Sequence, residues 1–160
     1  MAIRLKGRTP WRQKLEKPQE AKVVDVPLRM QKAWGSGRMV IATPMLVDEL
    51  VRRIPKGRLA TVAQLMARLA KDHHCDSTCP MTTGIFLRIV AETAEEDMAA
   101  GRRRIAPYWR VLKSDGSLNE RYPGGVNRQA GHLRSEGHKV VSVRPGRARV
   151  ADFARRLAKL

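Results

Sequence analysis

The fold is decided by the stretch IPKGRLATVAQ, residues 54–64, because one helix ends in it and another begins. Its Pro-Lys-Gly segment breaks the apolar helical pattern that precedes it. Thr61 and Gln64 are spaced as in a capping box, in which each side chain bonds the backbone N–H of the other residue. The stretch therefore predicts a connection between two helices, the second of which spans residues 62–71.

A helix on each side extends this pair. Thr43 is an N-cap residue and Pro44 suits the first helical position, so a helix is predicted over residues 44–53. A further helix is expected to begin near Thr82 or Thr83 and to end in the acidic run at residues 95–97. Its predicted apolar face carries Ile85, Phe86, Ile89 and Val90.

Short β elements are expected after the third helix. The run at 108–112 is strand-like, and residues 114–117 (Ser-Asp-Gly-Ser) suggest a turn. A helix is predicted over 127–136 with Gly137 behind it, then a small hairpin within 140–150, then a last helix capped by Asp152. Three helices followed by a β-turn wing predict a mainly α winged helix-turn-helix with a small β wing.

Two parts of the chain are distinguished. Residues 1–37 contain scattered basic residues and three prolines without a sustained apolar period, so we expect a poorly structured N-terminal arm. That arm is either a solvated basic tail or a segment that lies along phosphates. Residues 38–160 are expected to form a single domain, since a domain commonly takes roughly 100–200 residues.

Positive charge dominates the composition. Thirty-two Lys and Arg residues against 15 Asp and Glu residues give a net charge of +17, concentrated before residue 39 and after residue 100. Such a balance favours a polyanionic partner, foremost a nucleic acid. The sequence has no apolar run of roughly 18 residues and no secretory signal at its start, so a cytoplasmic protein without a membrane partner is expected.

Two cysteines, Cys75 and Cys79, lie beside His73 and His74. In a cytoplasmic protein they are expected to be free thiols rather than a disulfide. A metal site is conceivable chemically, but adjacent histidines point apart and a single cluster provides no paired C-x-x-C ligands. We therefore expect neither a metal nor a cofactor.

Several motifs together resemble one family, the methylated-DNA–protein cysteine methyltransferases. Residues 54–64 are similar to its "I-P-x-G-x-V-x-T-Y-G-x-I" segment, and residues 107–111 lie where the family has P-C-H-R-V. The similarity continues to residue 137 and covers about 43–138. It implies the C-terminal alkyltransferase domain, a winged helix-turn-helix that binds double-stranded DNA.

The departures from the family imply a protein that is not an enzyme. Tyr108 replaces the nucleophilic cysteine and Trp109 its neighbouring histidine, whereas alkyl transfer needs an activated thiolate. Glu136, which matches the outer member of the family's relay, is then expected to be structural. Val62 and Met81 stand where the family has a tyrosine and an arginine finger. The resemblance thus points to the alkyltransferase-like branch, which binds alkylated bases and flags them for nucleotide excision repair.

The residues expected to contact DNA fall into two sets. Phosphate contacts are predicted for Arg58, Thr82, Thr83, Arg102, Arg103, Arg104, Arg110 and Lys113. A base pocket is predicted from Met81, Tyr108 and Trp109.

Each assignment has a structural alternative. The threonines could be helix caps, Arg110 could belong to the wing scaffold, the arginine triplet to a solvated loop, and the two aromatics to the core. The predicted function is a monomeric, non-catalytic sensor of alkylated or otherwise damaged bases in duplex DNA that recruits nucleotide excision repair proteins. The alternative is a winged-helix regulator or nucleoid-type protein without lesion recognition.

Overall fold

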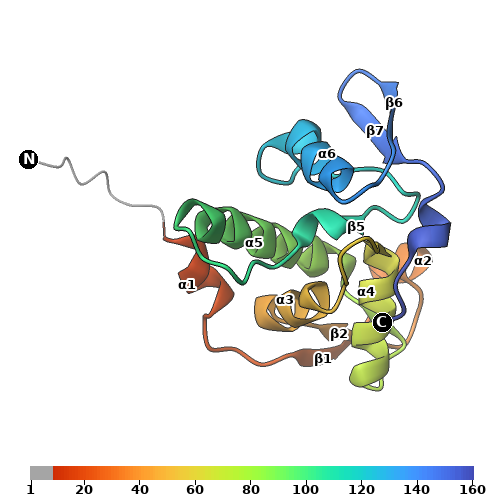
Figure 1. The fold of residues 1–160 in the computed structure, drawn as a ribbon. Helices are drawn as coiled ribbons and strands as arrows, with labels where there is room; N and C mark the ends of the chain where they lie inside the picture. The colour runs from red at the N-terminus through yellow and green to blue at the C-terminus, as the bar shows by residue number, and fades with distance from the viewer. Residues whose placement is uncertain (1–8) are drawn as a thin grey trace, which may run out of the picture.

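Three helices form the centre of the protein, whose computed structural model describes residues 9–160 (Figure 1). They are α3 (Pro44–Arg52), α4 (Val62–Asp72) and α5 (Pro80–Ala99), in the chain order predicted from the sequence. The remaining helical segments are α1 (Trp11–Leu15), α2 (Gln31–Trp34), α6 (Gly125–Ser135) and three 3₁₀ helices, η1 (Leu28–Met30), η2 (Tyr108–Arg110) and η3 (Phe153–Arg156). No helix within residues 9–160 is long and apolar enough to cross a membrane.

The predicted capping box starts α4. Thr61 Oγ1 accepts a hydrogen bond from the Gln64 N–H at 3.2 Å, and Gln64 Oε1 accepts one from the Thr61 N–H at 2.9 Å. These bonds satisfy backbone donors that the first turn of a helix leaves without partners. The Gln64 amide also donates to the Ala158 carbonyl at 2.9 Å, and the Ala158 N–H donates to the Leu59 carbonyl at 2.7 Å. Residues from the far end of the chain therefore hold the connection between α3 and α4.

Helix α5 starts earlier than predicted. Its N-cap is Cys79 and Pro80 occupies the first helical position, so Thr82 and Thr83 lie in the first turn and do not cap the helix. The helix also extends beyond the predicted acidic end, to Ala99. The sequence pattern missed this start because a cysteine N-cap forms no side-chain capping bond.

Strands pair in three small sheets. Strands β1 (Lys22–Asp25), β2 (Arg38–Ile41) and β4 (Ser77–Thr78) form one sheet, β3 (Ala60–Thr61) and β5 (Val111–Leu112) a parallel pair, and β6 (Val140–Arg144) and β7 (Arg147–Val150) a hairpin. The hairpin predicted within residues 140–150 is confirmed. It projects from the body beside α6 in Figure 1.

The N-terminal segment differs from the expected poorly structured arm. Strand β1 pairs antiparallel with β2, for example Val23 opposite Val40, and Leu15 of α1 is buried in the core. That expectation is therefore wrong for residues 9–37, and residues 1–8 lie outside the described residues. Elements of four or five residues are too short to produce a recognisable apolar period, which is why the sequence pattern missed them.

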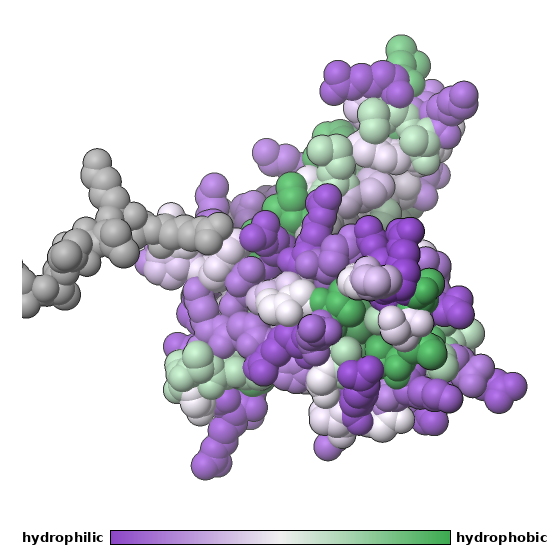
Figure 2. Space-filling view, turned by 90° about the horizontal axis from the view of Figure 1, so that it is seen from above, coloured by the Kyte–Doolittle hydropathy of each residue, from purple (hydrophilic) through white to green (hydrophobic). Residues whose placement is uncertain are grey.

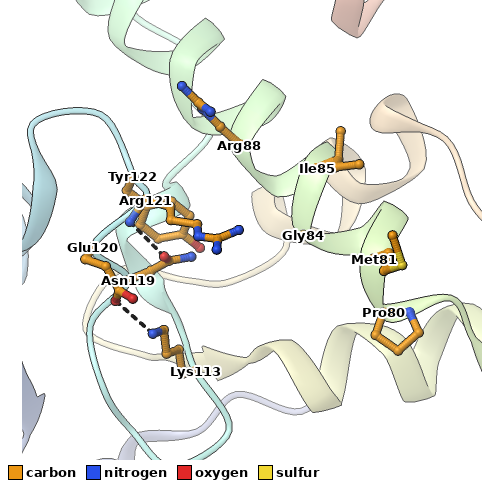
Figure 3. Close-up of a pocket in the computed structure, with 10 residues that line it drawn as sticks. All are labelled: Pro80, Met81, Gly84, Ile85, Arg88, Lys113, Asn119, Glu120, Arg121 and Tyr122. Atoms are coloured by element: carbon orange, nitrogen blue, oxygen red, sulfur yellow. Dashed lines mark hydrogen bonds and ion pairs between the residues drawn. The ribbon is translucent and has the colours of Figure 1, made fainter. Parts of the chain in front are cut away.

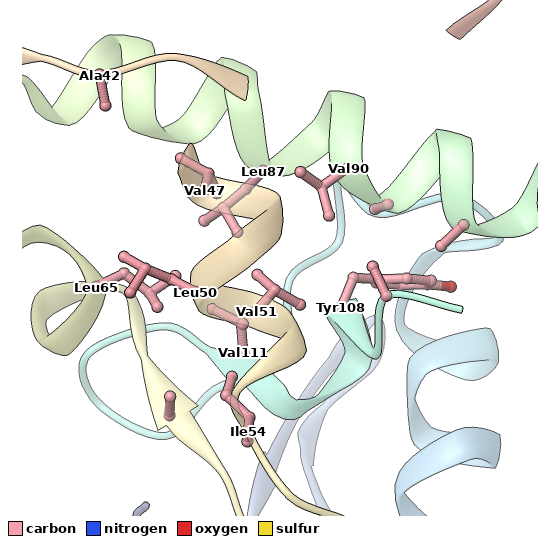
Figure 4. Close-up of a cluster of buried hydrophobic side chains, with 14 of the residues drawn as sticks. Ala42, Val47, Leu50, Val51, Ile54, Leu65, Leu87, Val90, Tyr108 and Val111 are labelled. Carbon is pink, nitrogen blue, oxygen red and sulfur yellow. The ribbon is translucent and has the colours of Figure 1, made fainter. Parts of the chain in front are cut away.

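The main core lies between α3, α5 and the segment after α5 (Figure 4). Val47 and Val51 of α3 meet Leu87 and Val90 of α5, all of them buried. The predicted strand at 108–112 is wrong over its first three residues, which form the 3₁₀ helix η2. This turn places the Tyr108 ring inside the core, where no part of it is exposed.

The segment between β5 and α6 is shaped by a tight turn. Gly116 has a φ of +85°, and a Cβ at this position would lie 2.3 Å from Cδ1 of Phe153. A glycine is therefore required where the predicted wing turn packs against η3. Asp152 also has a positive φ and makes no capping bond, so the predicted capped helix after it is wrong: only the short η3 forms.

A candidate nucleic-acid interface at the start of α5

A groove of about 450 Å³ separates the first half of α5 from the segment 113–122 (Figure 3). This volume is within the range of about 300–1,000 Å³ typical of small-molecule sites. The lining residues are Pro80, Met81, Gly84, Ile85, Arg88, Lys113, Asn119, Glu120, Arg121 and Tyr122. Two of the residues predicted to contact DNA, Met81 and Lys113, therefore lie on facing walls.

The α5 wall exposes apolar side chains. Met81 is 64% exposed and Ile85 is 56% exposed, an uncommon state for large apolar side chains that are four residues apart on one helix face. Arg88 continues the same face one turn further, with its guanidinium 3.8 Å from Glu92. The placement of Ile85 on the buried face of the predicted helix is wrong.

The opposite wall is held by ion pairs. Glu120 accepts from Lys113 Nζ at 2.7 Å and from Arg147 Nη1 at 3.0 Å. The hydrogen bond from Lys113 is the main reason that the pKa of Glu120 falls to about 2. Arg121 is exposed and makes no ion pair with any residue of the described part, and its side chain extends from the loop toward α5 in Figure 3. It is thus an available cation at the groove.

Tyr108 lies behind this wall rather than in the groove. Its ring packs edge-on against Tyr122 at 5.1 Å and against Trp109 at 5.4 Å. Its hydroxyl donates to Glu95. Burial and the adjacent Glu95 carboxylate raise the pKa of Tyr108 far above its ordinary value, so the phenol stays protonated. The Tyr108 ring itself therefore occupies the space that was predicted to be a base pocket.

Trp109 and Arg110 belong to a second cluster that is not part of the groove. The Trp109 ring stacks on His132 at 4.1 Å, and its Nε1 donates to Glu136 at 3.1 Å. Arg110 donates to Glu136 through Nε and Nη2, and to the Ile54 carbonyl through Nη1 at 2.7 Å.

The carboxylate of Glu136 is ionised in this cluster. Burial acts to raise its pKa, but the hydrogen bonds from Arg110 and Trp109 outweigh burial and the pKa lies below its ordinary value. The Arg110 side chain is 12% exposed and that of Glu136 is 6% exposed. The geometry agrees with the scaffold alternative for Arg110, and with the structural role expected for Glu136.

The two threonines also point inward. Thr83 is fully buried and its hydroxyl donates to the Cys79 carbonyl at 2.8 Å. Thr82 is half-buried and donates to the same carbonyl at 3.3 Å. Thr83 therefore has no route to a phosphate, and the structure contradicts its predicted contact.

The predicted arginine contacts lie away from the groove. Arg102, Arg103 and Arg104 follow the far end of α5, whose 20 residues span about 30 Å. Arg103 and Arg104 line a separate depression with Arg52 and Trp109. Arg58 lies elsewhere again, in a depression with Arg53 and Lys159. The structure thus distributes the predicted phosphate contacts over three surfaces.

Sequence reasoning missed several groove residues. Ile85, Arg88, Arg121 and Tyr122 line the groove but were not among the candidates. The available signal was helical spacing, because residues 81, 85 and 88 share one face of a helix that begins at residue 80.

The cysteines have structural surroundings. Cys79 is buried as the N-cap residue of α5, and Cys75 is half-buried with its Sγ 3.4 Å from the His73 carbonyl. Within residues 9–160, no three His, Cys, Asp or Glu side chains are grouped so that they could hold a metal ion.

No family model matches the chain, and no curated protein matches it in sequence. Two solved structures share its fold: a crystal structure of S. pombe Atl1 in complex with damaged DNA containing O6-carboxymethylguanine, and one of S. pombe ATL in complex with DNA. Each is 19% identical to this chain, and each match covers 73% of this chain and 94% of the solved chain. The TM-scores are 0.51 and 0.52. The predicted alkyltransferase-like fold is therefore confirmed.

Proposed function

We propose that this chain binds double-stranded DNA through the groove at the start of α5 and senses alkylated or otherwise damaged bases there. The observation that carries the proposal is the exposed pair Met81 and Ile85 on α5, flanked by the cation Arg121 on the facing loop. Helix α5 follows α4 as the second helix of a helix-turn-helix. In this motif the second helix is the one presented to a DNA groove. The net charge of +17 suits a polyanion.

The two solved structures that share the fold support DNA as the partner, since both are complexes with DNA and one contains damaged DNA. Apolar side chains beside cations fit such a partner. Met81 and Ile85 can compensate for stacking that a displaced base loses, a cost of a few kcal/mol, while arginines neutralise the flanking phosphates.

The proposal includes no chemical repair. The residue in the position of the family's nucleophile is Tyr108, a buried and protonated phenol. Alkyl transfer to a protein needs an accessible and activated nucleophile, which a buried phenol that stays protonated beside Glu95 does not provide. Recruitment of nucleotide excision repair proteins and a cytoplasmic location complete the proposed role.

A second function is favoured by one observation. Tyr108 fills the space beneath the groove. A base that is displaced from the DNA double helix therefore meets an open groove and not a deep pocket. A winged-helix regulator or nucleoid-type protein would need only the groove face and the basic surface. The two functions differ in whether the protein discriminates a damaged base.

A duplex titration at fixed salt separates them. The wild-type protein is titrated with duplexes that differ only in one O6-alkylguanine, and the double variant Met81→Ala/Ile85→Ala is compared with it. We expect tighter binding to the alkylated duplex, and loss of this preference in the double variant. Met45→Ala is the matched control, because Met45 is also exposed but lies on α3 outside the groove.

Each contrary result has a definite meaning. Equal wild-type affinity for both duplexes overturns the sensor and leaves the regulator. Absence of duplex binding overturns both. Mass spectrometry after incubation with alkylated DNA should show no added mass, and an alkyl adduct on Cys75 or Cys79 would contradict the non-catalytic assignment.

A further inference from the structure

The β6–β7 hairpin has one buried and one exposed face. Strands β6 and β7 pair antiparallel, with Val141 opposite Arg149 and Arg144 opposite Arg147. The inner face packs through Ala148 and Val150 against a small apolar cluster. The outer face is free of such packing and projects away from the body (Figure 1).

The outer face combines cations with apolar side chains. Val143, at the bulge of β6, is 62% exposed, and Val141 is 39% exposed. Arg144 and Arg149 are exposed and form no ion pair with any residue from 9 to 160. Seen from above, the molecule likewise shows hydrophobic patches separated by hydrophilic side chains (Figure 2).

The hairpin is joined to the wall of the groove. The Leu118 N–H donates to the Ala148 carbonyl at 3.0 Å, and Ser117 forms a β-bridge with Arg149. At the tip, Arg147 Nη1 lies 3.0 Å from Oε1 of Glu120, which lines the groove. The tip of the hairpin and the rim of the groove are therefore one continuous surface.

We propose that the outer face of this hairpin is a second contact with the duplex that occupies the groove. A two-stranded β ribbon fits the major groove of B-DNA, and arginines on its face can reach phosphates. In this arrangement Arg144 and Arg149 neutralise phosphates that flank the base bound at the groove. Val143 contacts the sugars and bases between those phosphates. The inference rests on the proposed function, because it assigns the hairpin to the same duplex.

Charge and position together favour DNA over an acidic protein. An acidic protein could bind the unpaired arginines equally well, but it would have no reason to require contact with the groove rim. Glu120, the carboxylate on the groove rim beside the hairpin tip, is already paired with Lys113 and Arg147. A polyanion running from the groove past Arg147 toward the tip therefore meets Glu120 as a carboxylate that is already paired.

The test is the salt dependence of duplex binding by the double variant Arg144→Ala/Arg149→Ala. We expect weaker binding to alkylated and unmodified duplexes alike, with a slope of log affinity against log salt that is smaller by about 0.9 for each arginine that contacts a phosphate. The preference for the alkylated duplex should be unchanged. Lys22→Ala/Lys71→Ala is the control, since it removes the same charge from exposed positions on β1 and α4, which lie at the other end of the molecule from the hairpin (Figure 1).

A second variant tests the tip itself. Val143→Asp places a negative charge at the tip and should weaken binding, whereas the neutral Val143→Ser should weaken it less. Unchanged melting temperatures for all variants establish that the fold is intact. If the arginine variant and the lysine control show equal salt slopes, the hairpin contact is wrong and the groove proposal is unaffected. A wild-type protein that binds no duplex overturns the groove proposal and the hairpin contact with it.

Discussion

The site around Tyr108 and the groove beside Met81 lie on the two sides of the same wall, and they are built in opposite ways. Tyr108 is a polar aromatic residue that is entirely buried and bonded to Glu95, whereas Met81 is an apolar residue that is mostly exposed. The first site is closed by its own side chain, and the second is open with a volume of about 450 Å³. The comparison therefore favours the surface of α5 over the interior position of Tyr108 as the place for the recognition that we propose.

The largest expected effect concerns the closed site. Tyr108→Ala should lower the free energy of unfolding by about 3–5 kcal/mol, as removal of a buried aromatic ring commonly does. Tyr108→Phe keeps the ring but removes a hydrogen bond to Glu95, which retains Arg128, so a loss of about 1–2 kcal/mol is expected. Urea denaturation measures both. An alanine variant with full stability but no lesion preference would place Tyr108 in the recognition site instead.

The next effect concerns the scaffold under the closed site. Arg110→Ala leaves the buried Glu136 carboxylate without its ion pair and should cost about 3 kcal/mol of unfolding free energy. The double variant Arg110→Met/Glu136→Leu removes both charges and should recover part of this loss. If Arg110→Ala is stable and instead reduces the salt dependence of DNA binding, the scaffold role is wrong and the predicted phosphate contact of Arg110 is correct.

The open groove should behave differently. Arg88→Ala and Arg121→Ala should each change the unfolding free energy by no more than about 0.5 kcal/mol, because both side chains are exposed. Each should reduce the salt slope of duplex binding by about 0.9 if it contacts one phosphate. Salt-series titrations check this, with Arg102, Arg103 and Arg104 changed together as the comparison at the far end of α5. If the salt slope falls only in the variant of Arg102, Arg103 and Arg104, the phosphate contacts lie at the far end of α5 and not at the groove.

The smallest effect is a pH dependence at the groove wall. The pKa of Glu120 is about 2, below its ordinary value of 4.5, so its ion pairs stabilise the fold fully above about pH 4.5. This contribution is lost as the pH falls toward 2. Glu120→Gln should therefore flatten the dependence of stability on pH between 4.5 and 2, modestly because the side chain is 38% exposed. Denaturation at several pH values tests this, and parallel wild-type and variant curves would refute it.

The sequence predicted the elements whose signals are local. The Thr61–Gln64 capping box, the proline after Thr43 and the turn at 114–117 were each readable, because their signals come from neighbouring residues. These signals were sufficient for α3, α4 and the order of the elements.

What could not be predicted depends on distant contacts. Ile85 looked like a core residue because its neighbours are apolar, yet it is 56% exposed. Arg110 looked like a surface cation, but its partner Glu136 is 26 residues away. The burial of Tyr108 depends likewise on Glu95 and Tyr122, which come from separate elements. Side-chain exposure is therefore the property on which the site assignments failed.

The contact between Ala158 and the α3–α4 connection has a consequence for how the chain folds during synthesis. Gln64 and Ala158 are separated by 94 residues. At about 5–20 residues per second, the helix pair waits roughly 5–20 s on the ribosome for this partner. During that interval the start of α4 depends on the local capping bonds of Thr61, joined by the pairing of β3 with β5 once residues 111–112 have been made. The capping box thus has a kinetic role, because its bonds join neighbouring residues and can support this turn before the distant partner has been made.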